Sequence, residues 1–373
     1  MYDVREIEQL DKEVTSSIES VSDTNSALSI LANNENVLAN EEYSYANKLT
    51  IMASTAELLG CDKYEVSAEG IADIIKTIIN SLKKFISKIW EKIIKLVKTV
   101  YKYIRNDDTE LDDMIKNTDN LSTEARSNES AGEQNYKLPE FLVTDSSIQA
   151  DGLARVRYMS SKFKNVRLSL YTAMVEYMRT AHDELGRSDI INMNFSPFKD
   201  FFYGTTVKMY DNDKELSIIL ATIKTELDSY AQGFKFIVGY DKINMHIVMP
   251  LSPETNITKI PCDRKNLRID TGIFFNNYIH DNLLELKSIK GSTLAEEENI
   301  VEISNLLRAT KTIISNSMQF HADNKTNLAV LNNYMKEMTA AIPNLIRSLN
   351  MCNLVMYSEY KMILKNIYKV EKK

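Results

Sequence analysis

Apolar residues recur every three or four positions through most of this chain, which is the spacing of one face of an α-helix. The clearest example is residues 71–105, where one continuous apolar face alternates with lysine-rich faces. An unbroken helix of this length would span about 52 Å at 1.5 Å per residue. Its apolar positions are Ile71, Ile74, Ile75, Ile78, Leu82, Phe85, Ile86, Ile89, Ile93, Leu96, Val97, Val100 and Ile104.

Shorter helices are predicted before this segment. Apolar residues repeat at helical spacing through residues 7–21, at Ile7, Leu10, Val14, Ile18 and Val21. A second helix is predicted from Glu41 to Leu59, where Gly60 would end it. The apolar stripes of both helices are narrow. We therefore expect residues 1–69 to form a leader that is only loosely attached to the rest of the chain.

The C-terminal part continues the helical pattern. One helix is predicted over residues 153–184, and another begins at Thr293, which has capping-box spacing to Glu296. Residues 328–356 carry an uninterrupted heptad seam, within which Pro343 should kink the helix. The seam could pack inside the chain or join copies of it, so oligomerisation through 328–356 is left open.

A β-hairpin is the main departure from the helical period. Residues 234–238 and 243–249 carry β-branched or alternating apolar residues, and residues 239–242 form a turn sequence between them. Residues 267–269 could add a short third strand. The predicted fold is therefore mainly α, with a small β insertion near 234–270.

The same patterns divide the chain into four parts. The segment before the main domain is acidic and polar and has few side chains to bury, so we expect it to be a linker. The parts are an acidic helical leader (1–69), a basic amphipathic helix (70–105), the acidic and polar linker (106–148) and a main helical domain with the β insertion (149–373).

Composition favours long helices and gives no sign of catalytic chemistry. Glycine and proline number only ten and six in 373 residues, and both usually interrupt helices. The three cysteines lie far apart and the four histidines have no partner at metal-binding spacing, so we expect no metal and no cofactor. Phosphate-loop, dinucleotide-binding, zinc-protease and serine-hydrolase motifs are all missing, so no catalytic residue is nominated.

The net charge of −7 hides a strong asymmetry. Residues 1–69 carry a net charge of −10, whereas residues 70–105 carry +7. An acidic chain is a poor general binder of nucleic acid, so contact with DNA or an anionic membrane would be confined to the basic helix. The candidate contact residues are Lys76, Lys83, Lys84, Lys88, Trp90, Lys92, Lys95, Lys98 and Lys102.

Three interpretations of the basic helix stay open on the sequence. As a surface-seeking helix, it would sink its apolar face into a lipid interface, with Trp90, Tyr101 and Tyr103 at the boundary and the lysines on anionic headgroups. As a structural helix, it would pack on the main domain and leave its lysines in water. As a DNA-contacting helix, it would bind phosphates through its lysines, without sequence specificity and with strong salt dependence.

A possible proteolytic site lies at the start of this helix. Ser67, Ala68, Glu69 and Gly70 stand where charge and periodicity change abruptly. A protease draws its substrate into an extended strand; small residues and a glycine ease that step, and a glutamate supplies one charge for recognition. The alternative is an ordinary helix start, with Ser67 as the N-cap and Glu69 in the first turn.

An acidic helical leader, the sequence Ser67-Ala68-Glu69-Gly70 and a basic amphipathic helix together resemble internal head proteins of large myovirus-type tailed phages. The resemblance covers residues 1–105 and is one of pattern; residues 136–373 resemble no family. It implies a virion structural protein, made in the host cytoplasm as a precursor, cut after Glu69 by the prohead protease and held inside the capsid; some proteins of this group are ejected with the DNA. Its partners would be that protease, other virion proteins, and DNA or an anionic membrane through residues 70–105.

Two other functions are kept as alternatives. The first is an uncleaved peripheral adaptor that binds membranes through the basic amphipathic helix. The second is an enzyme of unknown type with its site in residues 150–373, which a pocket with convergent polar groups would support.

Overall fold

The computed structural model describes most of the helical chain and two short β-ladders. The described residues are 4–39, 43–60, 68–105, 110–117, 133–139, 164, 167–168, 171–172, 174–180, 182–183, 236–237, 248–249, 264–270, 275–320 and 328–371. Helices predominate among them, which confirms the predicted mainly α class.

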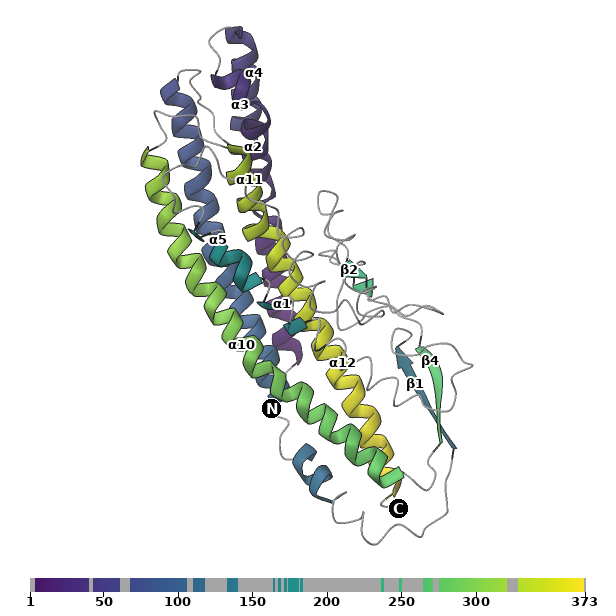
Figure 1. The fold of residues 1–373 in the computed structure, drawn as a ribbon. Coiled ribbons are helices and arrows are strands. Elements are labelled where there is room, and N and C mark those ends of the chain that lie inside the picture. The colour runs from purple at the N-terminus through teal and green to yellow at the C-terminus, as the bar shows by residue number, and fades with distance from the viewer. Residues whose placement is uncertain are drawn as a thin grey trace, which may run out of the picture.

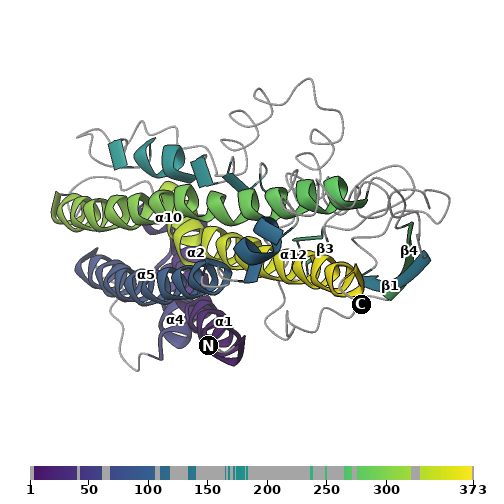
Figure 2. The same cartoon turned by 90° about the horizontal axis from the view of Figure 1, so that it is seen from below.

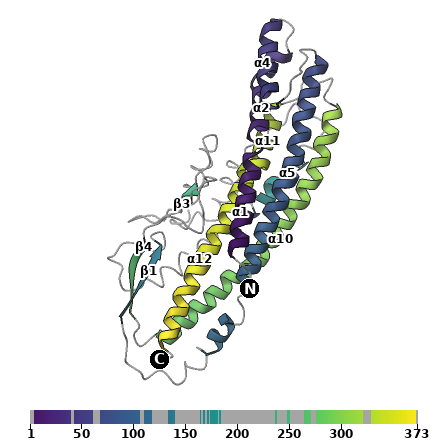
Figure 3. The same ribbon diagram turned by 180° about the vertical axis from the view of Figure 1, so that it is seen from behind.

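The long helices lie side by side in an elongated bundle (Figures 1 and 3). Helix α5 contacts α1, α2, α10, the π-helix η7 and α12, so it is the helix around which the bundle is built. The helices are α1 (Val4–Glu19), α2 (Ser22–Asn33), α3 (Glu35–Ala39), α4 (Tyr45–Leu58), α5 (Ala68–Arg105), α10 (Phe275–Phe320), α11 (Leu328–Lys336), η7 (Glu337–Ala341) and α12 (Ile342–Glu371).

Apolar spacing and end-capping residues account for the leader helices, as the sequence predicts. The apolar positions predicted for residues 7–21 are all buried. Ser44 caps α4, because its hydroxyl accepts a hydrogen bond from the backbone N–H of Asn47 at 3.4 Å. Gly60 adopts φ of +63°, the left-handed conformation in which a glycine commonly ends a helix.

The leader is not loosely attached, and that prediction is wrong. Its helices run antiparallel to the C-terminal helices, and buried polar pairs hold the register. Asp11 accepts hydrogen bonds from Arg347, at 2.9 Å for Oδ2, and both side chains are buried. Further along come Asn25 with Thr339 (2.9 Å), Ser29 with Asn332 (3.1 Å), and Glu35 with the backbone N–H of Leu328 (3.3 Å).

The heptad seam of residues 328–356 packs inside the chain wherever its side chains are described. Leu328, Leu331, Met335, Met338, Ile342 and Leu349 are all buried in the core that α1, α2 and α5 share. The sequence left open whether this seam fills the bundle or joins copies of the chain. At these positions it packs within one molecule.

Pro343 changes the helix in a specific way. The preceding turn is the π-helix η7, in which the N–H of Ile342 donates to the carbonyl of Glu337. In this pattern the carbonyl of Met338 would accept from residue 343, but proline has no N–H. The indole Nε1 of Trp90 on α5 donates to that carbonyl instead, at 2.8 Å. The predicted kink is thus a π-turn closed by a tryptophan from another helix.

Helix α10 begins earlier than expected. It starts at Phe275, so Thr293 and Glu296 lie inside it, and the predicted capping box is wrong. Thr293 donates to the carbonyl of Lys290 within the helix, and Glu296 points into the core. Capping-box spacing is one helical turn, so it also occurs by chance within helices.

The expected linker is partly folded. Residues 110–117 are helical and bury Leu111, Met114 and Ile115 against the core. Strand β1 (Glu133–Pro139) pairs antiparallel with β4 (Arg264–Asp270), which contains the strand suggested for residues 267–269. An unbroken linker over 106–148 is therefore the wrong interpretation.

The structure describes only two residues on each side of the predicted hairpin, so the hairpin stays a prediction. β2 (Phe236–Ile237) pairs antiparallel with β3 (Val248–Met249). The proposed turn at 239–242 and most of the helix expected over 153–184 lie outside the described residues.

Candidate functional site

Helix α5 separates an apolar inner face from a basic outer face. Its inner residues Ile78, Ile89, Ile93, Val97 and Val100 are fully buried against the leader and the C-terminal helices. The apolar face is therefore occupied by the chain itself, as the structural interpretation of this helix requires.

The lysines of α5 are distributed unevenly. Lys76, Lys84, Lys88, Lys95, Lys98 and Lys102 are exposed. Lys83 is only 8% exposed, and Lys92 is partly buried, where it bonds the carbonyl of Glu13 on α1 at 3.3 Å. Lys83 and Lys92 are thus less available to a partner than the sequence suggests.

Trp90 also lies inside the bundle. It is 3% exposed and bound to the Met338 carbonyl. The expected contact of Trp90 with a membrane is therefore wrong for this arrangement, because the ring that would insert into lipid fills the core.

Five exposed lysines form what we call the lysine row: Lys84, Lys88, Lys95, Lys98 and Lys102. They follow each other at helical spacing along about 27 Å of α5, with Glu91 between the second and third. The leader packs against the apolar face of α5; its Glu13 forms an ion pair with Lys92, and its Glu6 lines a surface groove together with Lys95, Lys98 and Lys102. The row is a solvated strip of positive charge.

The C-terminal end of the row borders a surface groove of about 530 Å³. Lysine and arginine side chains share its walls with three glutamates, one of which, Glu297 on α10, forms an ion pair with Arg105. The lining residues are Glu6, Glu91, Ile94, Lys95, Lys98, Thr99, Lys102, Arg105 and Glu297. Three lysines of the row, Lys95, Lys98 and Lys102, share these walls with the glutamates, so their positive charge is partly offset here.

The suspected cleavage junction lies at the N-terminal end of the same helix. Helix α5 begins at Ala68, so Glu69 and Gly70 belong to its first turn. Ser67 lies outside the described residues, and Gly70 is half-buried. This position fits the helix-start interpretation, and it also leaves the junction in the turn that frays most easily, because its N–H groups have no partner within the helix.

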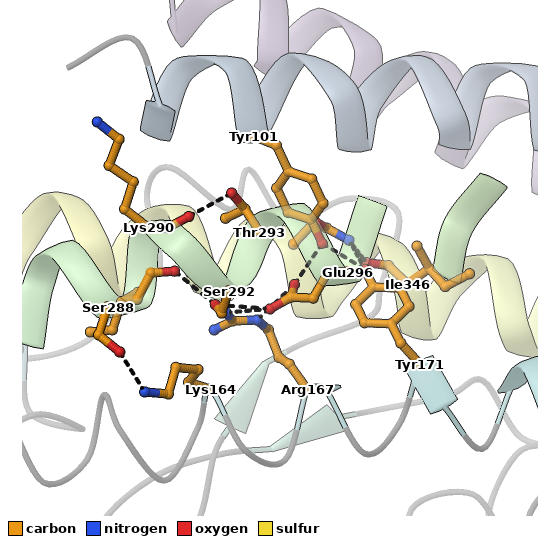
Figure 4. A network of polar contacts seen from close by, with 12 residues as sticks. Tyr101, Lys164, Arg167, Tyr171, Ser288, Lys290, Ser292, Thr293, Glu296 and Ile346 are labelled. Carbon is orange, nitrogen blue, oxygen red and sulfur yellow. Dashed lines mark hydrogen bonds and ion pairs between the residues drawn. The ribbon is translucent and has the colours of Figure 1, made fainter. Parts of the chain in front are cut away.

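A second group of polar residues is buried between four segments (Figure 4). Arg167 binds Glu296 of α10 through Nη2 to Oε1 at 2.8 Å and Nε to Oε2 at 3.2 Å. Tyr101 of α5 donates to Oε2 of Glu296 at 2.6 Å and lies 3.4 Å from the hydroxyl of Tyr171. Asn350 of α12 donates to the Tyr171 hydroxyl. We call these five residues the buried cluster.

Burial and neighbouring charges shift the pKa values of Tyr101, Tyr171 and Arg167. Burial, followed by the neighbouring Tyr171 and Glu296, raises the pKa of Tyr101 well above its ordinary value. Burial likewise raises the pKa of Tyr171. Burial alone would lower the pKa of Arg167, but the Glu296 carboxylate outweighs it and raises that pKa. Both tyrosines therefore remain donors, and the arginine remains charged.

The cluster joins several helices through its buried ion pair. Arg167 and Glu296 are 1% and 0% exposed, and they bind each other. Convergent polar groups were the expected sign of an enzyme in residues 150–373, but here they tie α5, α10, α12 and the helical residues near 167–171 together.

Sequence reasoning predicted none of these contacts: it gave Tyr101 and Glu296 other roles and did not single out Arg167, Tyr171 or Asn350. Arg167 and Tyr171 do share a helical face at a spacing of four, which is the one local signal that they act together. The partners Glu296 and Asn350 are more than a hundred residues away in the chain, so nothing in the sequence connects them.

No group of His, Cys, Asp and Glu suited to a metal ion occurs within the described residues. In the same part of the chain, every helix is too short or too polar to cross a membrane. Comparison with protein-family models, with curated proteins and with solved structures finds no match for this chain.

Proposed function

We propose that this chain is a structural protein of the head of a tailed phage, made as a precursor and cut after Glu69. The observation that carries the proposal is the position of the junction. The small-x-Glu-Gly sequence stands where the acidic leader ends and the basic helix begins, in the first turn of α5. Opening that turn breaks few helical hydrogen bonds, so a protease can extend it at low cost.

The leader then serves the folding of the bundle. Its helices supply apolar side chains and polar pairs to the bundle, and the lysines of the row remain exposed to solvent. Cleavage after Glu69 would leave the leader bound until something displaces it. The body would stay inside the capsid, where the lysine row faces packaged DNA or neighbouring proteins, and could leave the head with the DNA.

The test is the N-terminal residue and intact mass of the protein from purified particles, for the native chain and for two variants. We expect the native chain and Glu65→Gln to begin at Gly70, because Glu65 follows Lys63 and Tyr64 and does not fit the small-x-Glu pattern. Glu69→Gln should keep residue 1, because it removes the charge that the protease would recognise. Native protein that begins at Met1 would contradict the proposal.

A second function is favoured by the exposure of the lysine row. An uncleaved peripheral adaptor could rest on an anionic membrane through these lysines while the apolar face of α5 stays in the core. Such binding would be electrostatic and strongly salt-dependent, unlike that of an inserted amphipathic helix.

Flotation with anionic vesicles separates this function from the first. Each lysine near such a surface contributes about 1 kcal/mol, so Lys88→Gln with Lys98→Gln should weaken low-salt binding by roughly thirtyfold. Lys12 and Lys116 are exposed on other surfaces, and the same substitutions there make the matched control. Equal binding by the two double variants, or no binding by the native chain, would rule the adaptor out.

A further inference from the structure

Helix α10 has a stripe whose large apolar residues no described part of the chain covers. In Figures 1 and 3 much of the helix lies along one side of the bundle, and in Figure 2 helical residues near 167–183 lie beyond part of it. Three large apolar residues on it remain open to solvent: Leu284 at 44%, Leu294 at 55% and Val301 at 43% exposed. Together with the exposed Lys287, Gly291 and Glu298, they make up what we call the α10 stripe.

The stripe has the spacing of a coiled-coil seam. Its six positions follow each other at intervals of three, four, three, four and three residues, over about 26 Å of helix. This alternation normally marks residues that pack against a second helix. The buried face of α10, which includes Leu286, Ile289 and Ile300, is a separate surface that already packs on the bundle.

The order of residues in the stripe is self-complementary. Positions 284 and 301, 287 and 298, and 291 and 294 are symmetric about the midpoint between residues 292 and 293. Two antiparallel copies would therefore place Leu284 on Val301, Lys287 on Glu298, and Gly291 on Leu294. Each contact occurs twice, as a twofold interface requires.

Each of these pairs is chemically matched. Leu284 and Val301 bury apolar area, and Lys287 faces a carboxylate of opposite charge. A Cβ added at Gly291 would meet no atom within 4 Å, so the helix has an open dent where the Leu294 of the other copy can insert. A parallel pairing would instead place Lys287 on Lys287 and Glu298 on Glu298, which like-charge repulsion disfavours.

We propose that the α10 stripe is a homodimer interface, in which α10 pairs antiparallel with α10 of a second copy of this chain. Because the stripe is short, the interface should bury less than about 1,200 Å² of surface. We therefore expect a dissociation constant in the micromolar range. The proposal is independent of proteolytic processing, because the stripe lies entirely outside residues 1–105.

Sedimentation equilibrium of the full chain over a wide concentration range tests the dimer. Lys287→Glu and Glu298→Lys each replace two favourable pairs by two like-charge pairs, and each should weaken dimerisation at least about tenfold. Mixing the two variants restores opposite charges at both contacts, so the mixture should dimerise as the native chain does. The double variant Lys287→Glu with Glu298→Lys should also recover.

One control concerns the ion pair that Lys287 makes within the chain, with Asp112 at 2.8 Å. Asp112→Asn removes that pair without touching the stripe and should leave dimerisation unchanged. Leu294→Asp should abolish the dimer while Trp90 fluorescence and circular dichroism stay native. A native chain that stays monomeric, or single charge reversals that dimerise normally, or a mixture that does not recover, would overturn the proposal.

Discussion

Removal of residues 1–60 is expected to unfold most of the remaining bundle. The leader contributes large apolar side chains to the shared core, namely Ile7, Leu10, Val14, Val21, Leu28, Leu31 and Met52. Burial of each such side chain contributes about 1.5–3 kcal/mol. Their combined loss is on the order of 10 kcal/mol, comparable with the whole stability of a typical domain, about 5–15 kcal/mol.

Urea unfolding followed by circular dichroism and by fluorescence measures this effect. Trp90 is the only tryptophan, and it lies in the core, so its emission should shift to longer wavelength when residues 1–60 are missing. Supplying residues 1–60 as a separate chain should restore the native spectrum, because no covalent link is needed to fill the core. Lys12→Ala, on the exposed side of α1, is the matched control and should unfold like the native chain.

The same experiment bears on maturation. A shortened chain that unfolds cooperatively, at the same urea concentration as the full chain, would show that the leader is dispensable to the fold. A shortened chain that recovers only with added leader would mean that a protein cut after Glu69 keeps its leader, or that neighbours in the assembly replace it.

Local features of the fold could be predicted from the sequence. The apolar face of α5 was predicted over residues 71–105, and the helix runs from Ala68 to Arg105. Gly60 ends α4 as expected, and the heptad positions beyond residue 328 form part of the core. These features depend on neighbours within one or two helical turns, which a sequence displays directly.

Long-range polar packing could not be predicted. The leader was expected to be loose because its apolar stripes are narrow, but Asp11 and Asn25 are buried against Arg347 and Thr339. A polar residue enters a core when a distant residue supplies its partner, and only the folded chain identifies that partner. The lysine row combines both cases: its helical spacing is visible in the sequence, but the position of Glu6 of the leader beside Lys95, Lys98 and Lys102 is not.

Glu296→Ala is expected to lower the free energy of unfolding by about 3–5 kcal/mol, because it leaves the buried Arg167 without a counter-charge. It also removes the carboxylate to which Tyr101 donates its hydrogen bond. Urea unfolding of the full chain at neutral pH measures the loss. The matched control is Glu302→Ala, whose partner Arg179 is 48% exposed, and it should cost no more than about 1 kcal/mol.

A double variant distinguishes whether the buried charges stabilise the bundle or only align its helices. Replacing Arg167 by Met and Glu296 by Leu removes both charges and keeps similar volume, so we expect it to recover most of the lost stability. If stability returns, the charges are not needed for stability, and their remaining effect is to fix how α5, α10 and α12 align. The double variant should then unfold over a broader urea range, because apolar side chains allow more than one register. A loss equal to that of Glu296→Ala would instead mean that the ion pair itself stabilises the bundle.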